Sequence, residues 1–484
     1  MGKRLTDVLI LKSRVEFLSG GGYNDRYQRR TQIRVRFFFL VSLATLAALS
    51  LLAWKLEPRF APTGKTPLVW VSDDNPQRKL QIAGFNAASK DCSLRLDPNN
   101  SGMQKIIVQS LAGVGPDLFD TNAANLPVMV AADVAWDISD ELKRRGIELG
   151  REVWPSTLPL VRCNGRFYGV PANACTNALF INKKLFDQVG LPYPSGPWTW
   201  EQFLPLAQKL TIRDARGKPQ QFGFVMDWWT WPQFVIQWGG QVYSGDGTRC
   251  TLDSPEAIAG VQFLHDLIYK YKVMPSPVEE AAMATQGGWG SGTITQFGGN
   301  RAAMGFGGRW WLCTLRKKEQ FPDLSLTVAE CPHFKERVFL AYGRTTAINK
   351  HSPRREQALE YLLHMTGPAF NQGINDQADA LAAFPKYCEG ERFLHNPAFP
   401  DEDKNDVWRD VMAAGKPNPP SPFISSQLAD RIIGRQLDLV KNDQKPVADA
   451  LRTAAQEVNA EIQKTLQRDP DLKKRYETLT GGKP

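Results

Sequence analysis

Short strand-like runs alternate with helical segments early in this chain, and this alternation constrains its fold more than any other feature. The apolar run Leu68–Val71 and the run Pro116–Phe119 predict two strands. Helices are predicted between them over Arg78–Ser89 and Met103–Leu111. The repeated order of strand and helix predicts a parallel-rich α/β sheet.

Polar residues follow the ends of both predicted strands. Ligands of parallel α/β sheets bind at the carboxyl ends of the strands. The residues placed there are Asp73, Asp74, Asp120 and Asn122. Each is therefore a candidate ligand contact, although an acid or amide at such a position also serves simply to cap a helix.

A long uncharged segment precedes these strands. Phe37 to Trp54 is 18 residues without a charge, or about 27 Å of helix, which is enough to span a bilayer core. Nine Lys and Arg residues precede it. The positive-inside bias therefore predicts a basic cytoplasmic leader at residues 1–36, a transmembrane anchor at 37–56 and an extracytoplasmic body. A cleaved signal peptide is the alternative, but the leader is long and no clear cleavage site follows the run.

The positive charge of the chain is concentrated around that leader. Residues 1–60 hold 11 Lys and Arg against 4 Asp and Glu, whereas the remaining chain holds 48 against 46. The body is thus nearly neutral, and a basic face for nucleic acid is not implied.

Tryptophans crowd turn-like sequence in the middle of the chain. Large planar side chains in such places suit stacking on a flat face, such as that of a sugar ring or a base. The residues concerned include Trp228, Trp229, Trp231, Trp238, Trp289, Trp310 and Trp311. Trp231 and Trp311 are predicted to pack in the core. Trp289 lies in a Gly-rich loop and is either a lid aromatic or simply exposed.

Helix caps and a turn signal predict further elements. Thr199 with Gln202 forms a capping box before a helix, and Ser254 caps another helix that has Pro at its first turn. An amphipathic helix is predicted from about Val447 to Leu466, and Gly165–Pro171 is predicted to be a hairpin.

All seven Cys residues lie in the body. They include no CxxC pair and no His pair at ligand spacing, so a zinc site is not indicated. No metal and no cofactor are predicted. Seven is an odd number, so at least one thiol is free or pairs between chains, and between zero and three disulfides remain open.

Five motifs follow one another along the chain: Pro116–Phe119, Gly165–Pro171 leading to Asn182-Lys183, Thr199–Phe203, Phe297–Met304 before Gly308-Arg309-Trp310, and Ala347–Asn349. In this order they resemble the extracytoplasmic solute-binding proteins of ABC importers. The resemblance is to solute-binding protein family 1, the carbohydrate-binding family related to maltodextrin-binding protein, and covers roughly residues 66–470. Trp229–Pro232 also resembles an aromatic-Thr-Trp-Pro element of the maltodextrin binders.

The resemblance implies a two-lobed α/β protein of the type II periplasmic-binding-protein fold. Ligand would bind in the cleft between the lobes, which close around it by hinge motion. Lobe 1 is expected to comprise residues 68–174 plus 343–420, and lobe 2 residues 175–342 plus 421–484, after a linker at 57–67. The crossings between lobes are expected near Ala174-Cys175, Ala341–Gly343 and Pro417–Phe423.

The resemblance also implies which side chains meet a ligand. Trp228 and Trp310 match aromatic positions that stack on sugar in the relatives. Further contacts are expected beside the crossings, in the tryptophan segments and at the strand ends: Asn173, Asn177, Trp229, Trp289, Arg309, Tyr342 and Arg344, with Asp73, Asp74, Asp120 and Asn122. Cys175 stands where the maltodextrin binders carry an acid, so binding of the same sugar is not implied.

These observations predict the substrate-binding component of an ABC importer. It would be a monomer that delivers a sugar or oligosaccharide to a membrane permease. A membrane-tethered receptor domain that feeds a signalling partner is the first alternative. An extracellular carbohydrate-active enzyme is the second, but the chain has no GxSxG elbow, HExxH motif or Walker A loop. The protein is therefore predicted not to be an enzyme.

Overall fold

The computed structural model describes residues 38–50, 64–283, 292–400 and 402–482. Residues 38–50 are helical, and Lys65–Pro484 forms a compact unit of its own. Among the described residues, no helix is both long enough and apolar enough to cross a membrane. The anchor predicted at 37–56 is therefore not found, and its residues 37 and 51–56 lie outside the described part, as do the leader and residues 57–63 of the linker.

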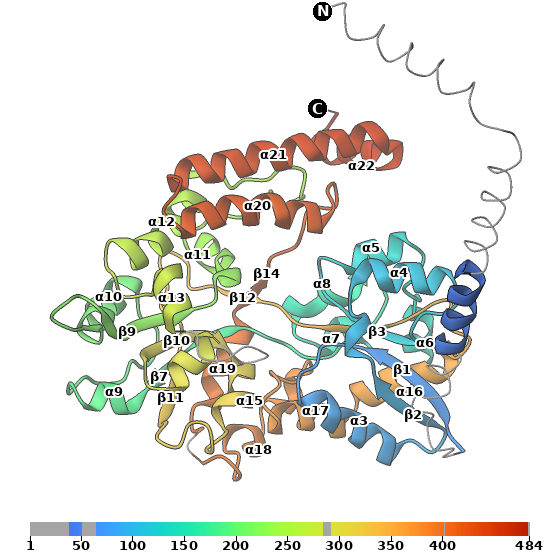
Figure 1. Cartoon of the computed structure of the whole chain (residues 1–484), viewed down its shortest axis with the longest axis horizontal. Helices are drawn as coiled ribbons and strands as arrows, with labels where there is room; N and C mark the ends of the chain where they lie inside the picture. The colour runs from blue at the N-terminus through green and yellow to red at the C-terminus, as the bar shows by residue number, and fades with distance from the viewer. Residues whose placement is uncertain (1–37, 51–63, 284–291, 401, 483–484) are drawn as a thin grey trace, which may run out of the picture. The chain divides into compact units, whose positions relative to one another are not determined.

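One five-stranded sheet, here called sheet 1, has the strand order β2-β1-β3-β13-β6 (Figure 1). Its strands are β1 (Thr66–Val71), β2 (Cys92–Leu96), β3 (Leu118–Thr121), β6 (Val170–Pro171) and β13 (Thr345–Ile348). β1 pairs in parallel with β2 and β3, and β13 joins β3 in the antiparallel direction. The connections are α3 (Gln77–Ala88) and α4 (Met103–Leu111), so the predicted alternation of strand and helix is confirmed.

A second five-stranded sheet, sheet 2, has the order β11-β7-β10-β9-β8. Its strands are β7 (Asn177–Asn182), β8 (Ile212–Arg213), β9 (Pro219–Met226), β10 (Ala302–Gly308) and β11 (Leu326–Ala329). β10 pairs in parallel with β9 and antiparallel with β7. The helix α10 (Trp200–Lys209) packs so closely on β9 that a Cβ at position 223 would collide with the carbonyl of Ala207. Gly223 therefore permits this close packing. The two sheets bear out the mixed α/β class.

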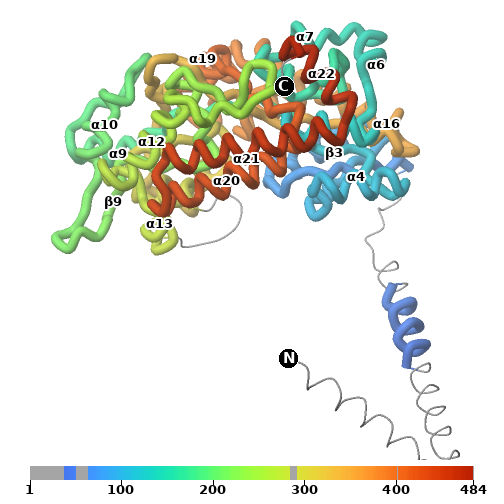
Figure 2. The backbone as a smooth tube through the Cα atoms, turned by 90° about the horizontal axis from the view of Figure 1, so that it is seen from above, coloured from blue at the N-terminus to red at the C-terminus, as the bar shows by residue number. Residues whose placement is uncertain are grey.

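Helices near the C-terminus cover two helices that lie between β9 and β10 in the sequence. α20 (Ser426–Lys441) and α21 (Val447–Arg468) lie side by side in both overall views (Figure 1, Figure 2). Their apolar faces share one core with α12 (Pro255–Tyr269), through residues such as Val261, Ile433 and Leu451. α11 (Pro232–Gln237) precedes α12, and α22 (Pro470–Thr480) ends the described chain.

The predicted helix caps are confirmed. Thr199 and Gln202 form the capping box of α10, which tolerates Pro205 inside it, and Ser254 caps α12 through the backbone amide of Ala257.

The remaining helices are α5 (Leu126–Ala131), α6 (Ser139–Arg144), α7 (Leu149–Glu152), α8 (Leu158–Val161), α9 (Lys183–Asp187), α13 (Pro277–Met283), α14 (Thr293–Gly298), α15 (Leu312–Leu315), α16 (Arg355–Thr366), α17 (Pro368–Asp376), α18 (Glu391–Leu394) and α19 (Asn405–Ala413). Short 3-10 turns are η1 (Pro98–Asn100), η2 (Pro155–Thr157), η3 (Trp228–Thr230), η4 (Arg309–Trp311) and η5 (Pro385–Tyr387).

Two short strand pairs complete the described fold. β4 (Arg162–Cys163) and β5 (Arg166–Phe167) form an antiparallel hairpin. The hairpin predicted at Gly165–Pro171 is therefore displaced, because Val170 and Pro171 form β6 of sheet 1. β12 (Phe339–Ala341) pairs in parallel with β14 (Gly415–Pro417). Backbone bridges join Cys175 to Tyr342 and Ala174 to Leu381. The segments predicted as the first two crossings are thus hydrogen-bonded to each other.

The expected lobe boundaries place all of residues 343–420 in lobe 1. α17 fits this expectation, because its Ile374 packs in the core of sheet 1 with Trp70. α19 does not, since the ring of Trp408 lies 5.4 Å from the ring of Phe180 in β7. α19 therefore packs with sheet 2, and an apolar helix face decides this association rather than its position in the chain.

Candidate functional site

Charged residues gather where β1 and β3 of sheet 1 end. Arg344, just before β13, lies among three carboxylates: Asp120, Asp379 at 3.2 Å and Asp73 at 3.9 Å. Beneath them, Arg78 of α3 pairs with Asp379 at 2.7 Å and with Asp73 at 2.9 Å. We call these five residues the charge cluster: Asp73, Arg78, Asp120, Arg344 and Asp379.

The carboxylate of Asp120 is held by several donors within sheet 1. The indole of Trp70 donates at 2.9 Å and the hydroxyl of Thr346 at 2.7 Å, and Ser72 and Arg344 donate to its other oxygen. With its lone pairs used in this way, Asp120 mainly orients Arg344. Asp73 is more open, with 43% of its side chain exposed.

The lower part of the charge cluster is buried. The side chains of Arg78 and Asp379 are only 1% and 2% exposed. Burial alone would raise the pKa of Asp379, but Arg78 and Arg344 outweigh it and hold that pKa far below its usual range. Burial opposes the charge of Arg78 as well, yet Asp379 and Asp73 raise its pKa. The pair is thus fully ionised at neutral pH and has a fixed geometry.

Aromatic residues gather at one edge of sheet 2. Because β9 and β10 are parallel, the turns that follow them, η3 and η4, lie at the same edge. Asn177 begins β7 at this edge, opposite Gly308. One aromatic side chain from each turn and one from the segment after β12 form what we call the aromatic group: Trp229, which is exposed, and Trp310 and Tyr342, which are partly buried.

The aromatic group is held together by specific contacts. The hydroxyl of Tyr342 donates to Asn177 Oδ1 at 2.8 Å, and the indole of Trp310 donates to that hydroxyl at 3.4 Å. Trp229 meets the ring of Tyr342 edge-on, with centroids 5.2 Å apart. Gly308 makes this approach feasible, because a Cβ there would come within 2.8 Å of the Tyr342 hydroxyl. Trp229 remains 48% exposed and offers a ring face to a ligand.

One crossing segment links the aromatic group to the charge cluster. Tyr342 and Arg344 are two residues apart on it, and the backbone of Tyr342 is paired with that of Cys175. Asn173 is buried, and its Oδ1 accepts the Arg344 backbone N–H at 3.0 Å. The predicted residues Asp73, Asp120, Asn173, Asn177, Trp229, Trp310, Tyr342 and Arg344 are thus brought together.

Trp228 differs from the prediction. It is only partly exposed, and it packs against the cores on both sides of η3, as Trp231 also does. Lys441 lies over its ring at 6.0 Å, and its buried indole N–H has no hydrogen-bond partner among the described residues. The exposed aromatic of this segment is therefore Trp229, because the 3-10 turn directs adjacent side chains to different sides.

Arg309 was wrongly expected to face a ligand. It is 3% exposed, and its guanidinium donates to the carbonyls of Asn375 at 2.8 Å and Ala380 at 3.0 Å, and to Asn405 at 3.1 Å. Its donors are used inside the protein, so it is unavailable to a solute. The turn η4 directs Trp310 outward and Arg309 inward.

The remaining predicted residues are not part of this arrangement. Asn122 is exposed, and its Oδ1 accepts the backbone amides of Ala124 and Asn125, so the capping alternative holds for it. Asp74 is exposed at the end of β1. Trp289 lies outside the described residues. Trp311 is fully buried and stacks on Phe180 at 5.3 Å, as predicted for a core residue.

Arg78 and Asp379 were missed at the sequence level. Arg78 lies on a predicted helix without any motif around it. Asp379 is 306 residues from Asp73 in sequence, and only the packing of α17 on sheet 1 brings it near. A pairing across such a separation leaves no local signal.

A large cavity among the described residues lies elsewhere. It has a volume of about 1120 Å³, and none of the residues of the charge cluster or the aromatic group lines it. Its walls come from α5, from the loop after α11, and from the segment between β14 and α20, and include Val128, Tyr243 and Phe423.

No group of three or more His, Cys, Asp or Glu among the described residues has metal-binding geometry. All seven Cys residues are free thiols, six of them buried.

Several curated proteins are similar to this chain. An arabinooligosaccharide-binding protein of Halalkalibacterium halodurans is 23% identical over 324 residues, which cover 62% of this chain and 67% of the relative. The sn-glycerol-3-phosphate-binding periplasmic protein of Agrobacterium fabrum is 23% identical over 194 residues, covering 36% of this chain and 44% of the relative.

Solved structures share the fold. An ABC substrate-binding protein of Listeria monocytogenes in complex with cycloalternan superposes with a TM-score of 0.69 at 19% identity, covering 83% of this chain and 99% of that one. The glycerophosphocholine complex of a Mycobacterium tuberculosis protein gives a TM-score of 0.66 at 17% identity, covering 84% and 99%.

A family profile gives the decisive match. The family described as bacterial extracellular solute-binding protein matches residues 75–372, which is more than half of the chain and extends from just before α3, through all of sheet 2, into α17. The chain therefore belongs to the bacterial extracellular solute-binding protein family.

Proposed function

We propose that this protein is the extracytoplasmic substrate-binding component of an ABC importer and binds a sugar or oligosaccharide. The ligand would lie between the aromatic group and the charge cluster. The observation that carries the proposal is their junction at Tyr342 and Arg344, with the half-exposed ring of Trp229 on one side. A sugar ring packs its apolar face on an aromatic ring and presents its hydroxyls to planar acids and amides.

Charge supports a neutral ligand over a phosphate ester. Both arginines of the charge cluster are already paired with carboxylates, and Asp73 is the exposed member. Binding a phosphate here would require breaking an existing ion pair or placing the anion beside Asp73. The relatives include both a protein named for an arabinooligosaccharide and one named for glycerol 3-phosphate. The charge cluster favours the first kind of ligand.

A thermal-shift screen of residues 61–484 tests the ligand class. The panel comprises arabinotriose, maltotriose, mannotriose, polyols, amino acids and glycerol 3-phosphate. A ligand at a hundred times its dissociation constant stabilises the folded state by about 2.7 kcal/mol. We expect stabilisation by neutral sugars alone. Stabilisation by glycerol 3-phosphate alone would keep the family and overturn the sugar assignment.

The cellular arrangement is part of the proposal. The binding body lies outside the cytoplasm as a monomer and delivers its solute to permease subunits in the membrane. We retain residues 37–56 as its membrane attachment, supported by the 18 uncharged residues from Phe37 to Trp54 and the basic residues before them. A carbonate wash of membranes tests this attachment, because an anchored chain stays in the pellet and a released one does not.

The division into two lobes is also proposed. Sheet 1 with α3, α4, α16 and α17 would form one lobe, and sheet 2 with α10 to α12 and α19 to α22 the other. The cores of the two sheets support this division, and it departs from the boundaries expected at first in giving α19 to the second lobe. Phe393 of α18 packs in the same core as Trp408 of α19. Proteolysis with and without a stabilising sugar would show whether the crossings become protected on binding.

A further inference from the structure

Helix α17 ends in a strained turn directly before Asp379. The backbone amide of Ala378 donates to the carbonyl of Asn375, and that of Asp379 to the carbonyl of Ile374, which is the Schellman pattern. The residue in the left-handed position of this pattern is usually Gly. Here it is Ala378, with φ of 55°, and it is fully buried. A Cβ in this conformation is unfavourable, so the surrounding structure must hold the turn in place.

Three side chains from the sheet 2 side hold it. Arg309 donates to the carbonyls of Asn375 and Ala380, as described above. Arg316 donates to the carbonyl of Asp376 at 2.7 Å. Cys313 places its thiol 3.5 Å from the carbonyl of Gln377 and 3.4 Å from that of Ala378. The backbone carbonyls around the turn are thus satisfied by side chains from another part of the chain.

The sequence spacing of these three residues explains how they act together. Arg309, Cys313 and Arg316 are four and three residues apart, so along η4 and α15 they lie on one face. η4 follows β10 directly and belongs to sheet 2, whereas α17 packs in the core of sheet 1. This contact joins the two sheets at a place separate from the predicted crossings.

Further side chains hold the guanidinium groups of Arg309 and Arg316 in place. Arg316 makes two hydrogen bonds to the carboxylate of Glu402, at 2.6 and 2.7 Å, and lies 3.6 Å from the ring centroid of Phe399. Arg309 lies 5.3 Å from the ring centroid of Phe393. Burial lowers the pKa of Arg309 to about 10, which still leaves it charged at neutral pH. A cation at the carboxyl end of a helix is stabilised by the helix dipole and by the unpaired carbonyls there.

The turn delivers Asp379 to the charge cluster. Ala380 and Asn375, which accept from Arg309, lie on either side of the strained turn. Asp379 in turn accepts from Arg78, Gln81 and Arg344. The path from the arginines to Arg344 therefore runs through hydrogen bonds to the backbone of the turn, and then through the side chain of Asp379.

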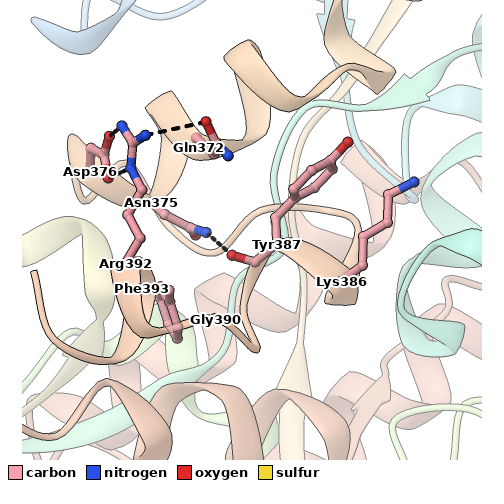
Figure 3. Close-up of a pocket in the computed structure, with 8 residues that line it drawn as sticks. All are labelled: Gln372, Asn375, Asp376, Lys386, Tyr387, Gly390, Arg392 and Phe393. Carbon is pink, nitrogen blue, oxygen red and sulfur yellow. Dashed lines mark hydrogen bonds and ion pairs between the residues drawn. The ribbon is translucent and has the colours of Figure 1, made fainter.

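Figure 3 shows the outer side of the same helix end. There Arg392 pairs with the side chain of Asp376 and with Gln372, and Asn375 donates to the carbonyl of Tyr387 (Figure 3). Arg392 is exposed and contacts a carboxylate rather than the turn carbonyls. Arg392 therefore serves as a control for Arg309 and Arg316, because it lies near α17 but makes no contact with the carbonyls of the turn.

We propose that Arg309 and Arg316 are positioning residues that cap the carboxyl end of α17 from the sheet 2 side and so set Asp379 against Arg344. The part of this inference that concerns ligand affinity rests on the proposed function. The part that concerns the turn does not. The sheet 2 side thereby fixes the position of a charge in sheet 1, beside the candidate ligand site.

Hydrogen exchange of the full chain, measured by mass spectrometry, tests the turn. In Arg309→Gln and Arg316→Gln we expect exchange over residues 374–382 to accelerate by about tenfold or more, because a charge-assisted hydrogen bond to the carbonyls is lost. Exchange in α21 should stay as in the parent. Arg392→Gln is the control and should leave residues 374–382 unchanged. Unchanged exchange there in both test variants, or an equal acceleration in α21, would overturn the proposal.

A second pair of variants covers the case in which Arg309→Gln does not fold. Arg309→Lys keeps the charge but cannot reach both carbonyls, so a smaller acceleration over residues 374–382 is expected. Adding Ala378→Gly removes the strain in the turn and should restore part of the protection. Failure of this rescue would mean that Arg309 fills space rather than holds the turn.

Titration with maltotriose separates the two proposals. Weaker binding by Arg309→Lys, with exchange altered at residues 374–382, supports both. If the parent does not bind maltotriose and the exchange result still holds, the positioning role stands and the sugar assignment loses support. If the parent binds and Arg309→Lys binds equally well despite altered exchange, the link from Asp379 to the ligand site is wrong.

Discussion

The two edges that meet at Tyr342 and Arg344 are built in opposite ways. At the edge of sheet 1, the charged groups are mostly paired with one another, and Arg78 and Asp379 are almost fully buried. At the edge of sheet 2, the aromatic rings have few polar partners, and Trp229 leaves about half of its surface exposed. The charged groups at the edge of sheet 1 thus have partners before any ligand binds, whereas the ring of Trp229 at the edge of sheet 2 still has a face exposed to solvent.

The difference suggests separate roles: the edge of sheet 1 keeps the site rigid, and the edge of sheet 2 offers surface for contact with a ligand. A buried ion-pair network fixes geometry but offers little net binding energy, because its groups have already exchanged water for each other. An exposed indole still gains from removal of its face from water. We therefore expect mutations at the sheet 1 edge to act mainly on stability and mutations at the sheet 2 edge mainly on affinity.

The largest effect is expected for Asp379→Ala. This change takes a shared partner from the buried Arg78 and from the partly buried Arg344, which costs about 3–5 kcal/mol of unfolding free energy. Chemical denaturation of the variant measures that loss. Asp376→Ala is a matched control three residues away, because its partner Arg392 is exposed and the pair contributes at most about 1 kcal/mol. Equal losses in the two variants would contradict the contrast between the edges.

The same aspartate predicts a pH dependence. Its pKa is lowered in the folded protein by Arg78 and Arg344 against the effect of burial. As pH falls below the ordinary Asp value of about 3.9, the unfolded state takes up a proton that the folded state does not, so stability decreases. Above that value the contribution is fully present. Asp379→Asn should therefore flatten the decline of unfolding free energy below about pH 4, and an unchanged decline would place the relevant carboxylate elsewhere.

At the opposite edge, Trp229→Ala should reduce affinity without comparable loss of stability. Loss of stacking and of apolar burial should weaken the binding of the stabilising sugar by about 1–2 kcal/mol in calorimetry. The unfolding free energy should change by less than about 0.5 kcal/mol, because the side chain is half exposed. Trp228→Ala is the matched control: it packs between two cores, so roughly 2 kcal/mol of stability should be lost, with affinity nearly kept. The reverse pattern would restore Trp228 as the stacking residue.

Tyr342→Phe tests the junction with a smaller change. The phenol hydroxyl joins Asn177 and Trp310, and its removal leaves the Asn177 carbonyl oxygen without this donor. A loss of about 1 kcal/mol in affinity or stability is expected. Because burial raises the pKa of Tyr342 well above its usual range, the hydroxyl stays protonated as a donor, and binding should not vary between pH 7 and 9. A pH-dependent affinity in this range that Tyr342→Phe abolishes would contradict this role.

Local patterns predicted the parts of the fold that local physics determines. The capping box at Thr199 and the cap at Ser254 were found correctly, because each involves residues three apart. The alternation of β1, α3, α4 and β3 was likewise readable. The side on which α19 packs was not, since it depends on how an apolar face fits Phe180, more than two hundred residues earlier.

The candidate site divides in the same manner. Strand-end position identified Asp73 and Asp120, and the family resemblance identified Arg344 beside an expected crossing; the three side chains do converge. Sequence position could not tell that Trp228 packs inward while Trp229 faces outward, because a one-residue shift in a 3-10 turn reverses the two. Nor could it show that Arg309 donates its hydrogen bonds to the carbonyls of Asn375 and Ala380, because those acceptors are backbone atoms without a sequence signature.

The smallest expected effect concerns the cavity of about 1120 Å³, which none of the predicted site residues lines. Tyr243 contributes to its wall and is only partly buried. Tyr243→Ala should leave sugar affinity unchanged within about 0.3 kcal/mol, since the ring lies outside both the aromatic group and the charge cluster. Trp229→Ala, measured in the same calorimetric series, supplies the positive control. If Tyr243→Ala weakens binding by as much as Trp229→Ala does, the solute occupies the cavity, and the contrast between the two edges describes stability alone.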